Sequence, residues 1–355
     1  MGAVGPEPVA GDLPVGEVPA ANYLLPMRFG AFVPQGWRLD LAGIPVSEHW
    51  TVMAGVAGAI ERAGFESLWV YDHFHTVPRP TQEVTYEAWT LMGALAAVTS
   101  TVRLGQMCTA NSYRSPAYLA KVAASVDVIS GGRLEMGIGA GWYEHEYLAY
   151  GYDFPKPSVR IGQLGEAVEI MRRMWTEDEV HFEGEHYTLQ GAICRPRPVQ
   201  DPHVPLWIAG GGEKLTLSVA ARHASYTNFG NDLGEFVHKS EVLRGHCAGL
   251  GRDFDAIVRS SNFNVVCEKT EAAVQDRLAW YRSHLGALIG EERAERAVDA
   301  NFIQAGTAGT PEQLISVFRR WQEEGLDYAI VYMPDVAYDR SGLERFAAEV
   351  VPALA

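Results

Sequence analysis

Cysteine is scarce in this 355-residue chain, and the little that is present is scattered. The four cysteines (Cys108, Cys194, Cys247 and Cys267) lie far apart and form no Cys-x-x-Cys pair. This spacing argues against a disulfide framework and gives a zinc site no support. We therefore expect reduced thiols and a cytoplasmic location. The chain also lacks any run of about 18 apolar residues, so we expect no membrane span.

Positive charge is the second deficit. Lysine and arginine number 29 against 44 acidic residues, a formal net charge of -15. Because such a chain is repelled by phosphate backbones and anionic lipids, we expect neither a nucleic-acid nor a membrane partner. A small anionic ligand remains compatible, since one pocket can be positive on an acidic protein. Apolar residues are plentiful at 47%, enough for one α/β barrel or for two smaller domains.

The first 26 residues differ from the remainder. They are rich in Gly, Ala, Val and Pro, and they lack the basic start and compact apolar segment of a signal peptide. Their low complexity predicts an extension that is partly disordered. Alternatively, residues 23–25 pack on a partner subunit. We expect residues 1–26 to form this extension and residues 27–355 to form a single domain.

From residue 27 onward, strand patterns alternate with amphipathic helix patterns. We expect strands at residues 28–33, 66–71, 102–107, 133–138, 206–209, 225–229, 257–267 and 328–332. We expect helices at residues 48–63, 87–98, 116–129, 161–175, 270–285 and 311–324, and another soon after residue 212. Residues 179–189 alternate as a β-hairpin inserted before the fifth strand. Eight strand–helix units predict an α/β fold, a (β/α)8 TIM barrel, with an open doubly wound sheet as the alternative.

One strand pattern ends in three glycines, Gly210, Gly211 and Gly212, and a helix pattern follows at once. Glycines let the backbone approach a ligand and aim its N–H groups outward, and a helix N-terminus adds partial positive charge. This arrangement favours a phosphate cradle. A plain turn that needs positive φ is the alternative. Lys214 in the first helical turn opposes the helix dipole, which also favours a nearby anion.

In a (β/α)8 barrel, function lies at the carboxyl ends of the strands. Here those ends carry aromatic, amide and glycine groups, a mix that suits a flat ring with a phosphate tail. His73 follows the second strand and is the candidate acid–base residue, because histidine titrates near neutral pH. Asp72 beside it could anchor the loop or bias the histidine. His73 and His75 could also bind a metal, but later strands supply no further ligands, so we expect none.

Three stretches resemble the bacterial luciferase-like superfamily, and more narrowly its branch that depends on the deazaflavin coenzyme F-420 (F420 below). They are Asp72-His73, residues 139–147 and residues 207–214, and the resemblance extends over about residues 27–334. It implies a luciferase-like TIM barrel with a flavin or deazaflavin ring in its mouth and the phosphate on Gly210 to Gly212. It also implies a non-prolyl cis peptide near Gln106-Met107 and places His73 opposite the reactive ring.

On this resemblance we expect an oxidoreductase that moves a hydride between F420 and a small organic substrate. The alternatives are a monooxygenase using reduced FMN and O2, and a non-catalytic flavin-binding protein. Catalysis is assigned to His73 and Asp72. Cofactor binding is assigned to Gln106, Met107, Thr109, Gly139, Gly141, Trp142, His145, Gly210, Gly211, Gly212 and Lys214. The substrate pocket is assigned to Trp37, Phe74, Tyr113, Asn228 and Tyr332.

Some positions depart from the family pattern. Trp142 and His145 stand where some relatives carry Glu and Asn, and only Asn228 remains of an Asp-x-Trp-Asn pattern near the sixth strand. The roles of sugar-phosphate dehydrogenase residues therefore do not transfer directly to this chain. Family members are often dimers, so a homodimer is one arrangement that the resemblance implies, although no interface can be identified in the sequence.

Overall fold

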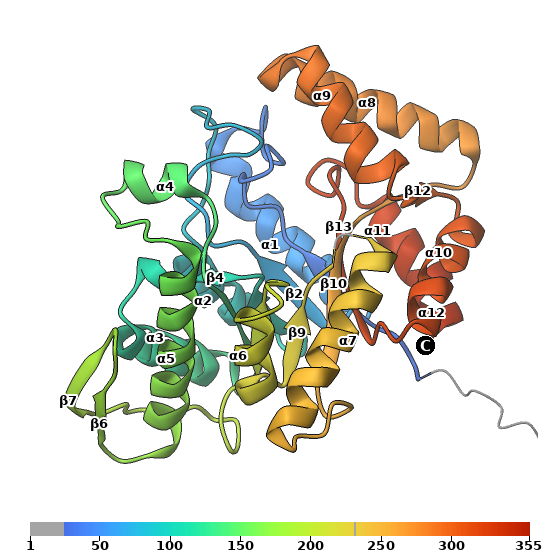
Figure 1. The fold of residues 1–355 in the computed structure, drawn as a ribbon. Helices are drawn as coiled ribbons and strands as arrows, with labels where there is room; N and C mark the ends of the chain where they lie inside the picture. The colour runs from blue at the N-terminus through green and yellow to red at the C-terminus, as the bar shows by residue number, and fades with distance from the viewer. Residues whose placement is uncertain (1–24, 231) are drawn as a thin grey trace, which may run out of the picture.

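The computed structural model describes residues 25–230 and 232–355 and contains a closed barrel of parallel strands (Figure 1). In chain order the barrel strands are β1 (Arg28–Phe32), β2 (Ser67–Val70), β3 (Arg103–Gln106), β5 (Leu134–Gly139), β8 (Leu206–Ala209), β9 (Tyr226–Asn228), β10 (Val258–Asn264) and β13 (Tyr328–Tyr332). Each pairs with the next, β13 returns to β1, and β3 pairs with β5. The predicted (β/α)8 barrel is confirmed, and the open sheet is wrong.

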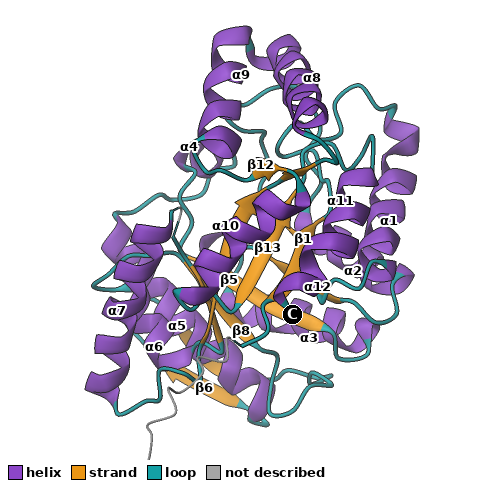
Figure 2. Cartoon of the chain, turned by 90° about the vertical axis from the view of Figure 1, so that its right-hand side faces the viewer, coloured by secondary structure: helices purple, strands orange, loops and turns teal. Residues whose placement is uncertain are grey.

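Helices surround the barrel on its outside (Figure 2). They are α1 (Val46–Arg62), α2 (Ala88–Val98), α3 (Pro116–Ser130), α5 (Pro157–Thr176), α6 (Thr216–His223), α7 (Leu233–Leu250) and α10 (Pro311–Glu323). The chain ends in α11 (Ser341–Arg345), the π-helical segment η3 (Phe346–Val350) and α12 (Val351–Leu354). The apolar face of each helix covers the outward-facing side chains of the strands.

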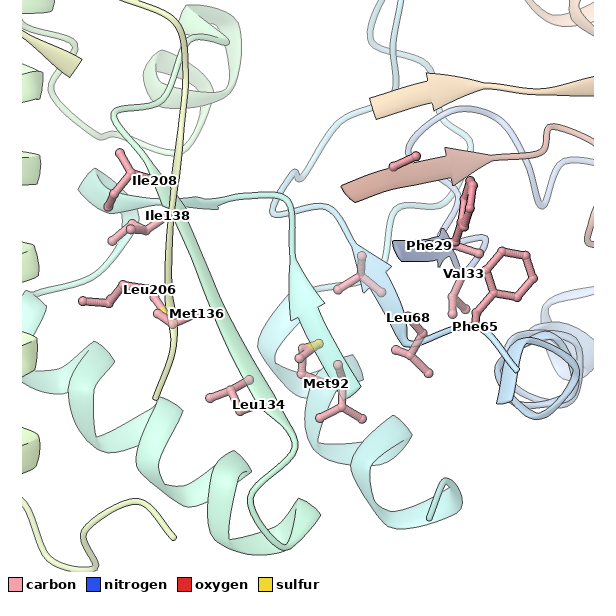
Figure 3. Packing of buried hydrophobic residues seen from close by; sticks show 14 of the residues in the cluster. Phe29, Val33, Phe65, Leu68, Met92, Leu134, Met136, Ile138, Leu206 and Ile208 are labelled. Carbon is pink, nitrogen blue, oxygen red and sulfur yellow. The ribbon is translucent and has the colours of Figure 1, made fainter. Parts of the chain in front are cut away.

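Alternation along the strands divides the apolar residues into two layers. On β5, Leu134, Met136 and Ile138 face outward beside Leu206 and Ile208 of β8, and Figure 3 shows these side chains packed together between strands and helices. The intervening positions face the barrel axis, which is filled mainly by aromatic rings. That inner cluster contains Phe32, Trp69, Tyr71, Met107, Trp207, Tyr328, Ile330 and Tyr332. The interior is therefore a packed core that supports whatever binds at the mouth.

Shorter elements lie in the connections. They are β4 (Thr109–Ala110), the 3-10 turn η1 (Asn111–Tyr113), α4 (Glu144–Ala149), β6 (Val180–Glu183), β7 (Thr188–Ala192), β11 (Val266–Cys267) and β12 (Ala308–Gly309). Strands β6 and β7 pair antiparallel between α5 and β8. Between β11 and β12 stand α8 (Glu271–Ile289), α9 (Glu291–Val298) and the π-helical segment η2 (Asp299–Ile303). Figures 1 and 2 show α4, α8 and α9 at the same end of the molecule.

The main deviations from the sequence prediction lie after β9. Helix α7 was not predicted, because its buried positions Phe236, Ser240, Leu243 and Cys247 form only a narrow stripe that includes a serine. The predicted strand over residues 257–267 is interrupted, since β10 ends at Asn264 and β11 pairs with β12 instead. The predicted extension over residues 1–26 lies almost entirely outside the described residues. Within residues 25–230 and 232–355, no helix has the length and apolarity needed to cross a bilayer.

Candidate active site

A cavity of about 570 Å³ opens at the carboxyl ends of the barrel strands. Segments that follow β1, β2, β3, β5 and β8 form its wall, and the first turn of α5 closes one side. Nine of the predicted site residues line it: Trp37, Asp72, His73, Met107, Tyr113, Gly139, Gly141, Trp142 and Gly210. The barrel therefore brings together residues that lie up to 173 positions apart (Trp37 to Gly210) around one space.

His73 is held at one end of this cavity by a buried carboxylate. Its Nδ1 lies 2.8 Å from Oε2 of Glu146, which belongs to α4 and is fully buried. The other carboxylate oxygen accepts the backbone N–H groups of Phe74 and His75, each at 2.8 Å. Because a carboxylate only accepts here, Nδ1 carries the hydrogen, and Nε2 is the ring nitrogen left for a ligand.

The ionisation of Glu146 follows from these contacts. Burial alone would raise its pKa, but the hydrogen bond and charge of His73, with the two backbone N–H groups, outweigh burial and lower the pKa below its usual value. Tyr113 adds a fourth donor, its hydroxyl lying 2.9 Å from Oε2. Burial and the neighbouring Glu146 raise the pKa of Tyr113, so the phenol keeps its proton. Glu146 is thus an anion that orients His73.

Aromatic rings enclose the histidine. The Trp37 ring stacks on the His73 ring at 4.2 Å with an interplanar angle of 1°. Trp142 and Tyr143 meet it edge-on, with centroids at 5.8 and 6.0 Å. These contacts restrict rotation of the imidazole, so Nε2 keeps one direction at the cavity wall.

Asp72 has a different environment from its neighbour. Its two oxygens accept from both terminal nitrogens of Arg114, at 2.7 and 3.0 Å, and one also accepts the Ala110 backbone N–H at 2.9 Å. The side chain is fully buried in this fork-shaped pair. Of the two roles weighed for Asp72, these contacts fit the anchor of the loop after β3. Both carboxylate oxygens are engaged by Arg114 and Ala110, which favours this anchoring role, and the catalytic assignment of Asp72 stays a prediction.

Another part of the cavity wall is suited to an anion. Gly139, the last residue of β5, and Gly141 line the cavity together with Gly210 and Thr216 after β8. Arg160, four residues into α5, lines the same wall and is 7% exposed. Its guanidinium donates to the Pro155 carbonyl and lies 3.9 Å from the Phe154 ring centroid, while its Nε has no hydrogen-bond partner among the residues that the structure describes. A buried cation with an unused donor favours an anionic ligand here.

The floor of the cavity includes Met107 and Cys108, which are joined by a non-prolyl cis peptide bond. The resemblance placed this bond near Gln106-Met107, one peptide earlier in the chain. Burial, with a smaller contribution from Asp72, raises the pKa of the Cys108 thiol to about 12. The thiol therefore remains protonated and is not a nucleophile at neutral pH.

Nine predicted site residues lie outside the cavity wall: Phe74, Gln106, Thr109, His145, Gly211, Gly212, Lys214, Asn228 and Tyr332. Strand alternation turns some of them inward, since Tyr332 lies in the barrel core under the Arg38 guanidinium. Gln106 and Thr109 are buried and bond to each other at 2.8 Å. Phe74 packs on Tyr113 and Tyr150 behind the wall.

The remaining members of this group lie beyond the rim or beside the wall. His145 is exposed on α4, with its ring 5.0 Å from that of His75. Gly211, Gly212 and Lys214 continue past the corner, and Lys214 points into solvent. Asn228 is buried and bonds to its neighbours on β10. Of the triple glycine, the cavity is thus lined by Gly210 alone.

Sequence reasoning missed two residues that matter most for the site. Glu146 lies in the quoted 139–147 stretch, but its pairing with His73 joins residues 73 positions apart and leaves no local signal. Arg160 did leave one, because it is a cation in the first turns of a helix that begins at Pro157. The dipole argument used for Lys214 applies equally to Arg160. Within the described ranges, no three His, Cys, Asp or Glu side chains gather as metal ligands would.

A family model described as luciferase-like monooxygenase matches residues 27–328. The chain belongs to the luciferase-like monooxygenase family. The match covers every barrel strand up to the first residue of β13. It confirms the resemblance and, at the level of the family, the prediction of an oxidoreductase.

Curated relatives of this luciferase-like chain include two kinds of enzyme. An F420-dependent glucose-6-phosphate dehydrogenase of Kineococcus radiotolerans is 34% identical over 324 residues, which cover 85% of this chain and 92% of the relative. A pyrimidine monooxygenase of Stutzerimonas stutzeri is 30% identical over 296 residues, which cover 78% of this chain and 80% of the relative. The family relationship therefore extends to dehydrogenases and monooxygenases alike.

Among solved structures, an F420-dependent secondary alcohol dehydrogenase bound to an F420–acetone adduct superposes with a TM-score of 0.74. The two chains share 22% sequence identity, and the match covers 93% of this chain and 100% of the other. At this identity the likeness shows the shared luciferase-like barrel fold.

Proposed function

We propose that this protein is an F420-dependent oxidoreductase that transfers a hydride to or from a small organic substrate. The observation that carries the proposal is a single cavity whose wall contains both an oriented acid–base group and a buried cation with an unused donor. His73 with Glu146 forms the first, and Arg160, near Gly210 and Thr216 in the lining, supplies the second. A planar redox cofactor with a phosphate tail needs both.

The residues present fit such a cofactor. Gly139 and Gly141 keep the wall open, since a Cβ added at Gly139 would lie 2.7 Å from the Cys108 sulfur and one at Gly141 would overlap the Tyr147 hydroxyl. Arg160 and Thr216 would hold the phosphate, with Gly210 giving close backbone approach. Met107, Cys108 and Ala110 would support the ring. When bound, the deazaflavin supplies a carbon that donates or accepts a hydride.

His73 would manage the proton that accompanies hydride transfer. In the neutral tautomer set by Glu146, Nε2 accepts a proton from a substrate hydroxyl, and in the protonated form it returns that proton to a substrate carbonyl. The Glu146 anion stabilises the imidazolium that forms in between. Trp37 and Trp142 exclude water from this transfer and give the substrate an apolar wall.

The second candidate is a monooxygenase that uses reduced FMN and O2. The 30% identity to a pyrimidine monooxygenase supports this second candidate. The same cavity serves either cofactor, because both carry a tricyclic ring and a ribityl phosphate. His73 would then orient or protonate an oxygenated substrate rather than an alcohol.

Titrating the purified protein separately with F420 and with FMN decides between these candidates. We expect F420 to bind with saturable fluorescence quenching and to be reduced, with loss of its absorbance band, when an alcohol substrate is present. Binding of FMN without binding of F420 would overturn the proposal, and oxygen uptake with reduced FMN would support the alternative. Binding of either cofactor without turnover across a broad panel would favour a non-catalytic flavin carrier.

A further inference from the structure

A second cavity, of about 390 Å³, adjoins the first at the carboxyl end of β10. Asn262 lines both cavities and therefore stands at their junction. The walls of the second cavity carry Asn264 from β10, Asn301 from η2, and Gln304 and Thr307 beyond it. Side-chain amides thus dominate its polar surface, while Phe263 and Trp321 supply an apolar backing.

Two chains of hydrogen bonds fix the direction of these amides. The first begins at the Thr227 carbonyl, which accepts the Ser260 hydroxyl at 2.6 Å. With its hydrogen used, Ser260 Oγ accepts from Asn228 Nδ2 at 3.0 Å, and the same Nδ2 donates to Asn262 Oδ1 at 3.1 Å. The Asn262 oxygen therefore faces Asn228. Its Nδ2 has two N–H groups that no residue in 25–230 or 232–355 accepts.

The second chain begins at a cation. Arg38 only donates, so Asn264 must turn its Oδ1 toward Nη1, at 2.6 Å. Asn264 Nδ2 then donates to Asn301 Oδ1 at 3.1 Å, and Asn301 Nδ2 donates to the Ala297 carbonyl at 2.7 Å. The π-helical turn of η2 places Asn301 within this reach. The far wall is thereby preorganised as well.

The charge of the second cavity is balanced. Its described wall contains one acid, Asp232, whose Oδ1 accepts the Glu235 backbone N–H as a helix cap, and one base, Arg320, on the exposed face of α10. The described wall therefore offers no net positive charge to an anionic ligand. A neutral ligand that carries hydroxyl or carbonyl oxygens matches both the amide donors and the amide acceptors.

We propose that the second cavity is a substrate subsite for a neutral, oxygen-rich group, and that the Nδ2 hydrogens of Asn262 donate to oxygens of that group. Asn228 acts through Asn262 as a positioning residue. This inference rests on the proposed function, because it assumes that the first cavity holds the redox ring while the substrate extends across the junction. It narrows the substrate to uncharged polyols and related hydroxylated compounds.

Calorimetric titration of the protein, with and without F420, tests the proposal using three probes on one ring: myo-inositol, cyclohexanol and myo-inositol 1-phosphate. We expect myo-inositol to bind at least about fivefold more tightly than cyclohexanol, the value of roughly one hydrogen bond. Asn262→Leu is expected to abolish this preference, measured in the absence and in the presence of F420. Asn228→Ala should reduce the preference without removing it, because Asn262 remains but loses its orientation. His181→Ala, on the distant β6, is the matched control.

Equal binding of cyclohexanol and myo-inositol, binding of neither, or an unchanged preference in Asn262→Leu would overturn the subsite. If myo-inositol 1-phosphate binds more tightly than myo-inositol, and Arg320→Gln abolishes this difference, the proposal that the subsite takes a neutral group is overturned. Asn262→Asp, which keeps the side-chain shape, guards against misfolding and should lose affinity for 1,4-dioxane, whose ether oxygens only accept hydrogen bonds. If the unsubstituted protein binds no F420 but still prefers myo-inositol over cyclohexanol, the proposed function is overturned and the proposed subsite is not.

Discussion

At the scale of single residues, the site depends on a histidine whose surroundings are fully specified. Glu146 sets the tautomer of His73, and Trp37 sets its ring plane. Neither partner neighbours His73 in the sequence. Catalytic power at such a site comes from orientation as much as from the titrating group itself, so both His73 and its anchor should be measurable by substitution.

His73→Ala removes the group assigned to proton transfer. We expect turnover to fall at least about 10²-fold, the low end for a general acid–base residue, while the affinity for F420 falls much less. Steady-state rates of F420 reduction and cofactor titrations measure the two effects. The exposed His181→Ala serves as the control. Unchanged turnover in the His73 variant would remove His73 from the catalytic assignment.

Glu146→Gln tests the anchor through pH. Since the native pKa of Glu146 lies below its ordinary value, its ionisation stabilises the fold fully above pH 4.5, and this contribution is lost as pH falls through the native pKa. We expect the variant to lose about 1.5–3 kcal/mol of unfolding free energy at pH 7, the value of hydrogen bonds to a charged group. Urea unfolding should show a smaller difference near pH 4. A pH-independent difference would contradict a role for the charge.

At the scale of elements, loops after parallel strands place the chemistry. The segment between β5 and α5 contributes Gly139, Gly141 and Trp142 to the wall and then, through α4, delivers Glu146 to His73. Gly141 has φ of 78° and packs against Tyr147. A side chain there would displace Tyr147 of α4, the helix that carries Glu146, so this glycine links the cavity wall to the anchor of His73.

Gly141→Ala and Gly151→Ala form a matched pair in that segment. Both glycines have positive φ, at 78° and 75°, but an added Cβ overlaps the Tyr147 hydroxyl at Gly141 and meets nothing within 4 Å at Gly151. We expect each variant to lose about 1 kcal/mol from backbone strain. Gly141→Ala alone should lose more and should weaken F420 binding. Thermal unfolding and cofactor titration compare them, and equal behaviour would contradict the coupling.

At the scale of the whole molecule, α8 and α9 form a helical hairpin that packs against the barrel. Helices α8 and α9 pack around their own apolar cluster, to which Leu39 and Val266 are the main contributions from the barrel side (Figure 1). Arg277 of α8 ties this hairpin to the barrel through Glu268, Asp335 and Asp339 at 2.6 to 3.1 Å. Because this apolar cluster is separate from the core of the barrel, we expect the hairpin of α8 and α9 to open without unfolding of the barrel.

Leu278→Ala should therefore act locally. Leu278 is fully buried within α8, and its truncation costs about 2–5 kcal/mol in a packed core. We expect faster hydrogen exchange in residues 271–303 and little change in β5 and β8. Leu206→Ala, in the apolar layer between the barrel strands and the outer helices, is the control and should lower protection throughout. Uniform exchange changes in the Leu278 variant would show that hairpin and barrel unfold as one unit.

The barrel can be predicted from the amino-acid sequence alone. Its strands and most of its helices follow from local periodicity. The bounds predicted for β8 and β13 match those in the structure, because buried parallel strands consist of continuous apolar runs. His73 and the glycines at strand ends could be found in the same way, since the fold puts strand ends at one mouth.

Which of those residues share the cavity, and what each one contacts, depends on how the elements pack in the folded protein. Glu146 bonds to His73, and Asp72 pairs with Arg114, through contacts between elements far apart in the chain. The Nε of Arg160 finds no partner among the described residues. Alternation along β13 turns Tyr332 into the core, and the bonds of Asn228 make it a support for Asn262. Periodicity fixes the faces of a strand, but the partner of a polar side chain is set by packing in three dimensions.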